Sequence, residues 1–189
     1  MPLPPPRLFT FAAGDTGAWT VTLMRAVIGE SLPDAAAIDV VAEAPASKVR
    51  STDTRWRLRG IVSNERYVER AEKDALVARQ EGLGRPACTR AALIPIRKTS
   101  AWWALTQDER RDVFEAQSRH IAIGMRYLPA IARRLHHCRD LGPDEPFDFL
   151  TWFEFTPDDA GAFEDLVGQL RASPEWRFID REVDIRLSR

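Results

Sequence analysis

Residues 147–155, FDFLTWFEF, form the clearest strand pattern in this sequence. Aromatic residues and Thr151 occupy the odd positions, and Asp148, Leu150, Trp152 and Glu154 occupy the even ones. Successive side chains of a strand point to opposite faces, so this period of two predicts a β-strand with two different faces. Thr156 and Pro157 then suit the start of a helix, whose apolar stripe is Phe163, Leu166, Val167 and Leu170.

The elements around this strand extend the pattern to the whole second half. ALIPIRK at 92–98 predicts a strand, in which Pro95 indicates an edge or a bulge. Thr106 and Glu109 form a capping box for a helix that continues to about residue 127, and residues 131–138 alternate as a strand. A last strand covers 175–187. The order β-α-β-β-α-β predicts an α+β, ferredoxin-like arrangement with two helices across one face of an antiparallel sheet.

The first half is less regular. Residues 17–29 and 55–63 are rich in β-branched and aromatic residues and predict strands. Ser63 or Asn64 can cap a helix that begins at residue 65 and ends at Gly82 or Gly84. Residues 31–53 have no sustained period, so we interpret them as a loop with room for one short element.

Composition excludes several functional classes. The 27 basic and 28 acidic residues nearly cancel, which disfavours nucleic acid or an anionic membrane as a partner. Cys88 and Cys138 match neither a disulfide framework nor a zinc site, and we interpret both as buried thiols of a protein in a reducing compartment. The sequence has no leader pattern and no apolar run of about 18 residues, so we expect a cytoplasmic location.

His120 and Arg133 are the candidate pair for a site. A continuous helix would separate them by about 20 Å, but Pro129 cannot continue a helix, so the chain must change structure between them. His120 then lies on a helix and Arg133 on the next strand, where both can contact one flat ligand between helix and sheet. A lone histidine of this kind is more often structural, and Arg133 alone is typical of a surface strand. His136 and His137 point to opposite strand faces and make a poor joint metal site.

Several segments together resemble the chlorite dismutases, in particular the short-chain, dimeric lineage of that haem b family. They are GDTGAW, RYVERAEK, AALIPIRKTSAWW, TQDERR, the His120–Arg133 segment, FDFLTWFE, FEDLVGQLR and REVDIRL. The resemblance implies that His120 is the proximal haem ligand and metal donor, Glu175 the carboxylate on its imidazole, and Arg133 the distal catalytic arginine. It also implies proximal Lys98 and Trp102, distal Leu128, Thr151 and Phe153, and propionate-binding Asn64, Arg66 and Tyr67.

The same resemblance implies an activity and an assembly. Members convert chlorite to chloride and dioxygen, through a ferryl species and a hypochlorite that stays in the pocket, and so detoxify chlorite. Each subunit of the homodimer holds two ferredoxin-like domains, here a trimmed unit at 1–90 and the haem-binding unit at 91–189. A guanidinium in an apolar pocket suits the attraction and retention of such anions.

Three alternatives remain. A coproheme decarboxylase of the same superfamily often has glutamine at the position of Arg133 and a reactive tyrosine on the strand ending near Lys98; here the arginine is present and ALIPIRK has no tyrosine. A non-catalytic haem-binding or dimerisation module on this fold stays open. An RNA-binding module would need exposed aromatics beside a basic surface, which the charge balance disfavours.

Overall fold

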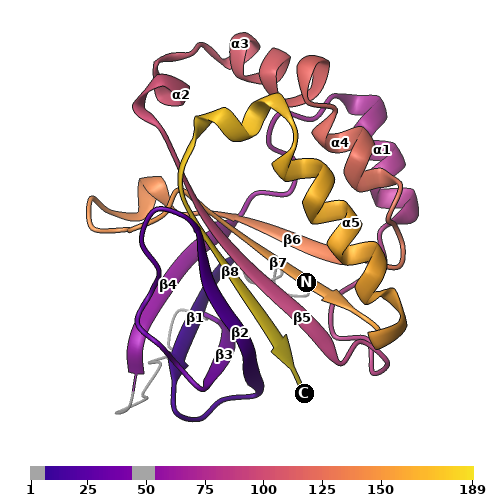
Figure 1. The fold of residues 1–189 in the computed structure, drawn as a ribbon. Coiled ribbons are helices and arrows are strands. Elements are labelled where there is room, and N and C mark those ends of the chain that lie inside the picture. Colours follow the sequence, from indigo (N-terminus) through magenta and orange to yellow (C-terminus); the bar gives the residue numbers. More distant parts are fainter. Residues whose placement is uncertain (1–6, 44–53) are drawn as a thin grey trace, which may run out of the picture.

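The computed structural model describes residues 7–43 and 54–189, which form a closed barrel of antiparallel strands with helices along one side (Figure 1). Around the barrel the strand order is β1-β3-β2-β8-β5-β7-β6-β4, and β4 pairs with β1 to close it. The strands are β1 Leu8–Gly14, β2 Trp19–Ile28, β3 Ala37–Ala42, β4 Thr54–Val62, β5 Arg90–Lys98, β6 Ala132–His137, β7 Phe149–Phe155 and β8 Ile179–Ser188.

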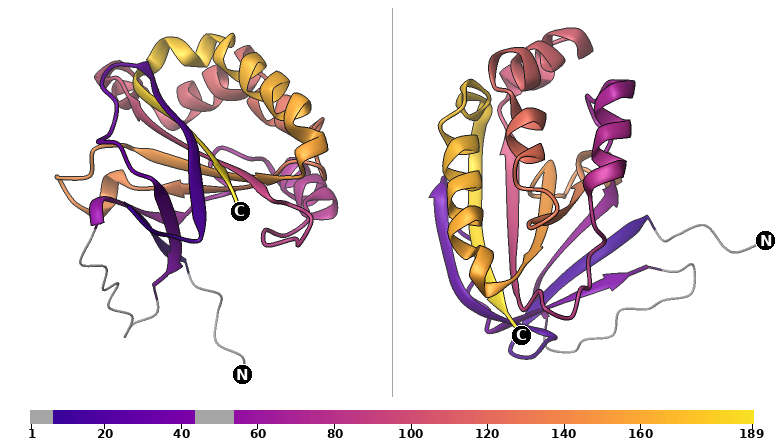
Figure 2. Two further views of the ribbon diagram at one scale, coloured as in Figure 1. Left: turned by 60° about the horizontal axis from the view of Figure 1, so that its bottom comes forward. Right: turned by 90° about the vertical axis from the view of Figure 1, so that its right-hand side faces the viewer.

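The helical layer is built from short pieces, and only two of its described helices reach ten residues. They are α1 Arg70–Arg79 and α5 Ala160–Arg171. The others are α2 Ser100–Ala104, α3 Gln107–Arg111, the π-helix η1 Asp112–Gln117, α4 His120–Met125, and the 3-10 helices η2 Arg139–Leu141, η3 Pro157–Asp159 and η4 Pro174–Phe178. In Figure 2, α5, α4 and α1 follow one another across the same side of the strands.

Strand order is the same in the two halves of the barrel. The second half runs β8-β5-β7-β6, which is the order 4-1-3-2 of a ferredoxin-like sheet, and its element order is the predicted β-α-β-β-α-β. The first half runs β4-β1-β3-β2, again 4-1-3-2, but only residues 15–18 connect β1 to β2. No helix can form in so short a connection.

Two apolar cores follow from the alternation of the strands. Phe11, Trp19, Leu93 and Trp152 lie inside the barrel, where all are almost fully buried. The opposite faces of β5 and β7 pack against α5, whose predicted apolar stripe is buried in full. Cys88 and Cys138 are buried free thiols, as interpreted. None of the described helices is long and apolar enough to cross a membrane.

One strand was missed and two boundary predictions were wrong. β1 was not anticipated, whereas β3 is the one short element for which the segment 31–53 had room; residues 44–53 lie outside the described part of the chain. The first helix begins at Arg70 after a turn at 64–67, because Glu69 and Glu72 form its capping box in place of Ser63 or Asn64. The final strand begins at Ile179, since Pro174–Phe178 form η4.

Pro95 does not lie at an edge. β5 is an interior strand between β7 and β8, and Pro95 pairs in register with Leu150 of β7. The pairs of β5 with β8 include Leu93 and Ile96 but skip Pro95, so the missing prolyl N–H falls at a gap in that ladder. The register of β5 against β8 does not change across this gap, so the bulge predicted at Pro95 is absent; the register shift of this strand pair lies between Arg97 and Lys98.

The helix expected from Thr106 to about residue 127 is broken. Its capping box is confirmed, because the side chains of Thr106 and Glu109 each accept the other's backbone N–H. The helix then widens to a π-helix and stops at Ser118, and Arg119 takes a left-handed φ of 52° before α4 restarts at His120. π-helical turns carry an extra residue and often mark functional positions.

Candidate functional site

A cavity of about 390 Å³ lies between the helical layer and the sheet. Side chains of β5, β6 and β7 form one wall, and η1, α4 and η4 form the opposite wall. The turn 64–68 and α1 line its edge. Among the residues predicted for the site, Leu128 does not line the cavity; it is half-buried in the turn before Pro129. The ten that do are Asn64, Arg66, Tyr67, Lys98, Trp102, His120, Arg133, Thr151, Phe153 and Glu175.

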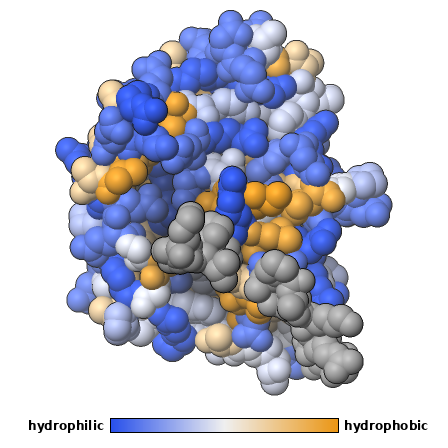
Figure 3. Space-filling model, turned by 180° about the vertical axis from the view of Figure 1, so that it is seen from behind, coloured by the Kyte–Doolittle hydropathy of each residue, from blue (hydrophilic) through white to orange (hydrophobic). Residues whose placement is uncertain are grey.

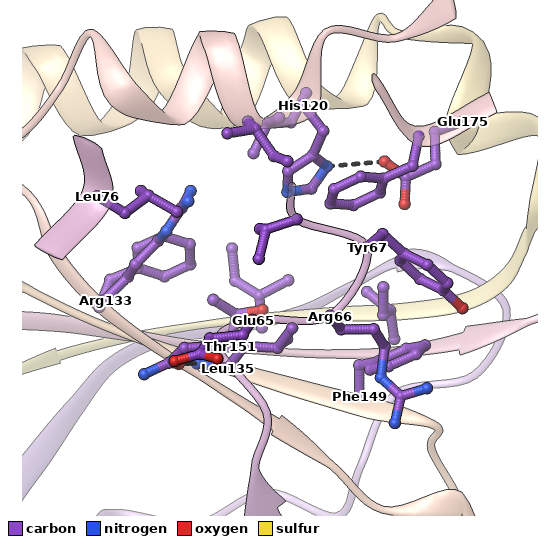
Figure 4. A pocket seen from close by; sticks show the side chains of 18 of the residues that line it. Glu65, Arg66, Tyr67, Leu76, His120, Arg133, Leu135, Phe149, Thr151 and Glu175 are labelled. Atoms are coloured by element: carbon purple, nitrogen blue, oxygen red, sulfur yellow. Dashed lines mark hydrogen bonds and ion pairs between the residues drawn. The ribbon is translucent and has the colours of Figure 1, made fainter. Parts of the chain in front are cut away.

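The imidazole of His120 is held by a buried carboxylate. Its Nδ1 lies 2.7 Å from Oε2 of Glu175, and the other oxygen of Glu175 accepts from Nζ of Lys98 at 2.5 Å (Figure 4). Lys98 in turn lies 4.2 Å from the ring centre of Trp102. Because the carboxylate occupies Nδ1, that nitrogen keeps its proton and Nε2 is left as the free electron-pair donor.

Charge stabilises this chain of three side chains. Burial alone would raise the pKa of Glu175, but the charge of Lys98 and the interactions with His120 outweigh it and lower the pKa to about 2. Burial lowers the pKa of Lys98, against the opposing effect of Glu175. Glu175 therefore stays ionised near neutral pH and can polarise His120.

The break before α4 is what positions His120. Ser118 accepts the backbone N–H of Glu175 at 2.8 Å, which joins η4 to the end of the π-helix. Glu115 accepts the N–H of Ile121 at 2.6 Å and of Ala122 at 3.2 Å, and so caps α4 from the preceding turn. Phe114 stacks on the imidazole, with ring centres 4.2 Å apart. The sequence did not indicate this role of Glu115, because Glu115 lies inside a helix and its spacing from α4 is not that of a capping box.

Arg133 projects from the opposite wall. Strand pairing places Arg133 beside Phe153 and Leu135 beside Thr151, so alternation brings all four side chains to the cavity face. Burial lowers the pKa of the guanidinium, and no carboxylate of the described residues pairs with its side chain. It crosses to α4, where a Cβ added to Gly124 would lie 2.1 Å from its Nη1.

The turn 64–68 supplies polar groups at the cavity edge. Asn64 accepts the backbone N–H of Leu135 at 2.8 Å, which ties the turn to β6, and Arg66 lies 5.6 Å from the ring centre of Phe149. The hydroxyl of Tyr67 and the indole N–H of Trp102 are buried without a partner among the described residues. Buried donors usually find a partner, so a ligand in this cavity or ordered water can supply the acceptors for these two groups.

These features fit a planar tetrapyrrole that carries carboxylates. The lining is mostly apolar, with few polar groups, and the described residues contain no group of three His, Cys, Asp or Glu that could hold a bare ion. One imidazole suits an iron whose other ligands come from a macrocycle. Arg66 and the unpartnered Tyr67 hydroxyl suit its carboxylates.

The ion pair of Glu175 predicts a pH dependence of stability. Its pKa in the folded protein, about 2, lies below the ordinary 4.5, so its contribution is fully present above pH 4.5 and is lost as the pH falls toward 2. Urea unfolding at stepped pH should show a steeper acid loss for the native protein than for Glu175→Gln. The two proteins share all their other carboxylates, so the difference between their slopes reports Glu175 alone. Equal slopes would contradict the assignment of this pH dependence to Glu175.

Comparisons with known proteins agree with this geometry. The family model described as chlorite dismutase matches residues 26–189. A chlorite dismutase of Ideonella dechloratans is 33% identical over 88 residues, which are 47% of this chain and 28% of that protein. The chain thus spans little more than a quarter of the length of that curated relative.

Solved structures extend the similarity to nearly the whole chain. A dimeric chlorite dismutase from Nitrobacter winogradskyi is 57% identical, with a TM-score of 0.86 over 96% of this chain and 99% of that one. Chlorite dismutase from Candidatus Nitrospira defluvii in complex with imidazole is 20% identical, with a TM-score of 0.65 over 96% of this chain and 91% of that one, and it supports the ferredoxin-like α+β fold alone. The chain described here belongs to the chlorite dismutase family.

Proposed function

We propose that this chain is a haem b-dependent chlorite dismutase that converts chlorite to chloride and dioxygen. The observation that carries the proposal is the hydrogen-bonded chain from His120 through Glu175 to Lys98 beside an apolar cavity. The guanidinium of Arg133, unpaired among the described residues, enters the same cavity from the wall opposite His120. Family membership supports the same activity. When bound, haem supplies the iron redox chemistry that breaks the Cl–O bonds of chlorite and forms the O–O bond of dioxygen.

The proximal residues hold and tune the cofactor. Nε2 of His120 would donate to the haem iron, and Glu175, which accepts the hydrogen bond from Nδ1, would make the imidazole a stronger electron donor. Lys98 keeps Glu175 ionised, and Trp102 covers the Lys98 ammonium. Asn64, Arg66 and Tyr67 hold the propionates at the turn, in the role that the resemblance predicted.

The distal residues handle the anions. Arg133, between the apolar Leu135 and Phe153, attracts chlorite and then holds the hypochlorite until it reacts again. Its guanidinium lies against Gly124 of α4, the helix that carries His120. Thr151 and Phe153 shape the pocket from β7, whereas Leu128 acts only if the turn before Pro129 moves toward the ligand.

Assembly and domain organisation extend this proposal. We assign residues 1–90 and 91–189 to a trimmed and a complete ferredoxin-like domain, which the repeated strand order 4-1-3-2 and the short β1–β2 connection support. We also propose a homodimer, since the 57% identical structure is a dimeric chlorite dismutase. The cytoplasmic location stays a prediction.

Oxygen evolution tests the activity. Purified protein loaded with haem b should release dioxygen on addition of chlorite, recorded with an oxygen electrode alongside the absorption spectrum. Haem binding without dioxygen release would reject the dismutase assignment and make coproheme the next ligand to test. No haem binding at all would reject the cofactor as well.

Arg133→Ala tests anion retention. We expect haem still to bind, kcat/KM for chlorite to fall about 10- to 100-fold, and more hypochlorite to escape into a chlorination trap, because the pocket loses the cation that contacts the anion. Arg126→Ala, which removes an exposed arginine at the end of α4, is the matched control and should behave as the native protein. Unchanged turnover and unchanged leakage in Arg133→Ala would remove Arg133 from the mechanism.

A further inference from the structure

The cavity wall formed by the turn 64–68 and α1 has little apolar packing beyond the ring contacts of Tyr67 with Trp102 and Phe114. Leu76 is the one buried residue of α1, and it lines the cavity. Val77, on the next position, is 71% exposed. In Figure 2, α1 lies at the outer edge of the helical layer. The space-filling view from behind (Figure 3) shows apolar side chains gathered in patches among hydrophilic ones. This wall therefore depends on polar contacts to keep its place.

One arginine behind the wall makes most of those contacts. Arg111, the last residue of α3, donates to both oxygens of Glu72 at 2.8 and 2.6 Å and lies 3.7 Å from Glu69. The same guanidinium donates to the backbone carbonyl of Tyr67. Arg111 does not line the cavity, so it acts on a ligand only through the residues it holds.

The conformation of Tyr67 explains why such a contact is needed. Its φ is 63°, a left-handed backbone that is unfavourable for a residue with a Cβ. The carbonyl bond from Arg111 fixes the peptide on the C-terminal side of this residue, and the buried hydroxyl lies at the cavity edge. Without that bond the turn can relax, and the position of Tyr67 would then rest on its ring contacts with Trp102 and Phe114.

The far end of α1 has its own attachment. Gln80 donates its amide to the backbone carbonyl of Arg133 at 2.8 Å, so the C-terminus of α1 is joined to β6. Lys73 pairs with Glu65 at 2.7 Å, but Glu65 is exposed and belongs to the same wall. Arg111 is thus the main tie between the N-terminal side of the wall and the helices that carry His120.

We propose that Arg111 and Glu72 form a clamp that sets how long the cofactor stays bound, with Arg111 as a positioning residue for Tyr67 and α1. The inference rests on the proposed function, in which this cavity holds haem. The opposite charges of the clamp reinforce each other, since the pKa of Glu72 is lowered chiefly by its hydrogen bond to Arg111 and that of Arg111 is raised chiefly by the same bond.

The test is haem loss to excess apomyoglobin, followed by absorbance. Arg111→Gln and Glu72→Gln should each release haem about tenfold faster than the native protein, because charge-assisted bonds are lost, and the double variant should be no faster than either single one. Arg111→Lys, which can keep the charge but not all three contacts, should be intermediate. Arg79→Gln, the same charge change on the exposed end of α1, should match the native rate.

Hydrogen exchange on the haem-free protein separates the clamp from the function. Residues 64–79 should exchange faster in Arg111→Gln than in the native protein, while β5 to β8 should be unchanged. Native rates of haem loss in both single variants, or unchanged exchange over 64–79, would overturn the clamp. Failure of the native protein to bind haem would overturn the proposed function, and the exchange rates over 64–79 would then decide whether Arg111 holds this wall.

Discussion

His120→Gly should lower haem affinity by at least about 100-fold. Loss of a residue that only supports a metal ligand lowers affinity about 10- to 100-fold, and loss of the ligand itself should lower it more. The imidazole is the proposed donor to the iron, and its contacts with Glu175 and Phe114 fix its position. Haem titration followed by absorbance gives the affinity. Added imidazole should fill the space left by the side chain and restore most of the ligand spectrum.

His137→Ala is the matched control, since His137 is a buried histidine of β6 that does not line the cavity. It should bind haem as the native protein does. Equal affinity of native protein and His120→Gly, or loss in both variants alike, would show that His120 is not the ligand.

Glu175→Ala should destabilise the haem-free protein by about 3–5 kcal/mol, because it leaves the buried ammonium of Lys98 without its partner. Glu175 and Lys98 are only 2% and 4% exposed, so water cannot replace the lost carboxylate. Urea unfolding without haem measures this free energy independently of any ligand. The variant should also bind haem more weakly, since the imidazole loses its acceptor.

Combining Lys98→Met with Glu175→Ala tests the cause of this loss of stability. If the penalty comes from an uncompensated charge, Glu175→Ala/Lys98→Met should recover a large part of the lost stability. A double variant as unstable as the sum of both single ones would instead assign the loss to cavity formation.

Much of the fold could be predicted, because strands and amphipathic helices carry their own period. The alternation at 147–155 identified β7, and the stripe from Phe163 to Leu170 identified the buried face of α5. The same logic placed Arg133 on a strand facing His120. From spacing alone, His120 would be interpreted as a structural histidine and Arg133 as a surface residue. Their roles as haem ligand and distal arginine were predicted from the family resemblance.

The rest depends on contacts between distant parts of the chain. Glu175 is 55 residues from His120 and 77 from Lys98, and nothing in its local sequence indicates burial. The helix break at Ser118 is stabilised by Glu115 and by the N–H of Glu175, again a tertiary effect. Leu128 shows a limit of the resemblance. The family pattern places this residue in the pocket, but it does not line the described cavity.

The register of β6 against β7 also determines where the chain can change length. One residue inserted between Ala132 and Arg133 would turn the Arg133 side chain into the barrel interior and bring the inserted residue to the cavity face in its place. An insertion in the turn between α4 and β6 leaves both faces as they are. Natural or designed length variation between His120 and Arg133 is therefore expected at residues 126–131 and not beyond them.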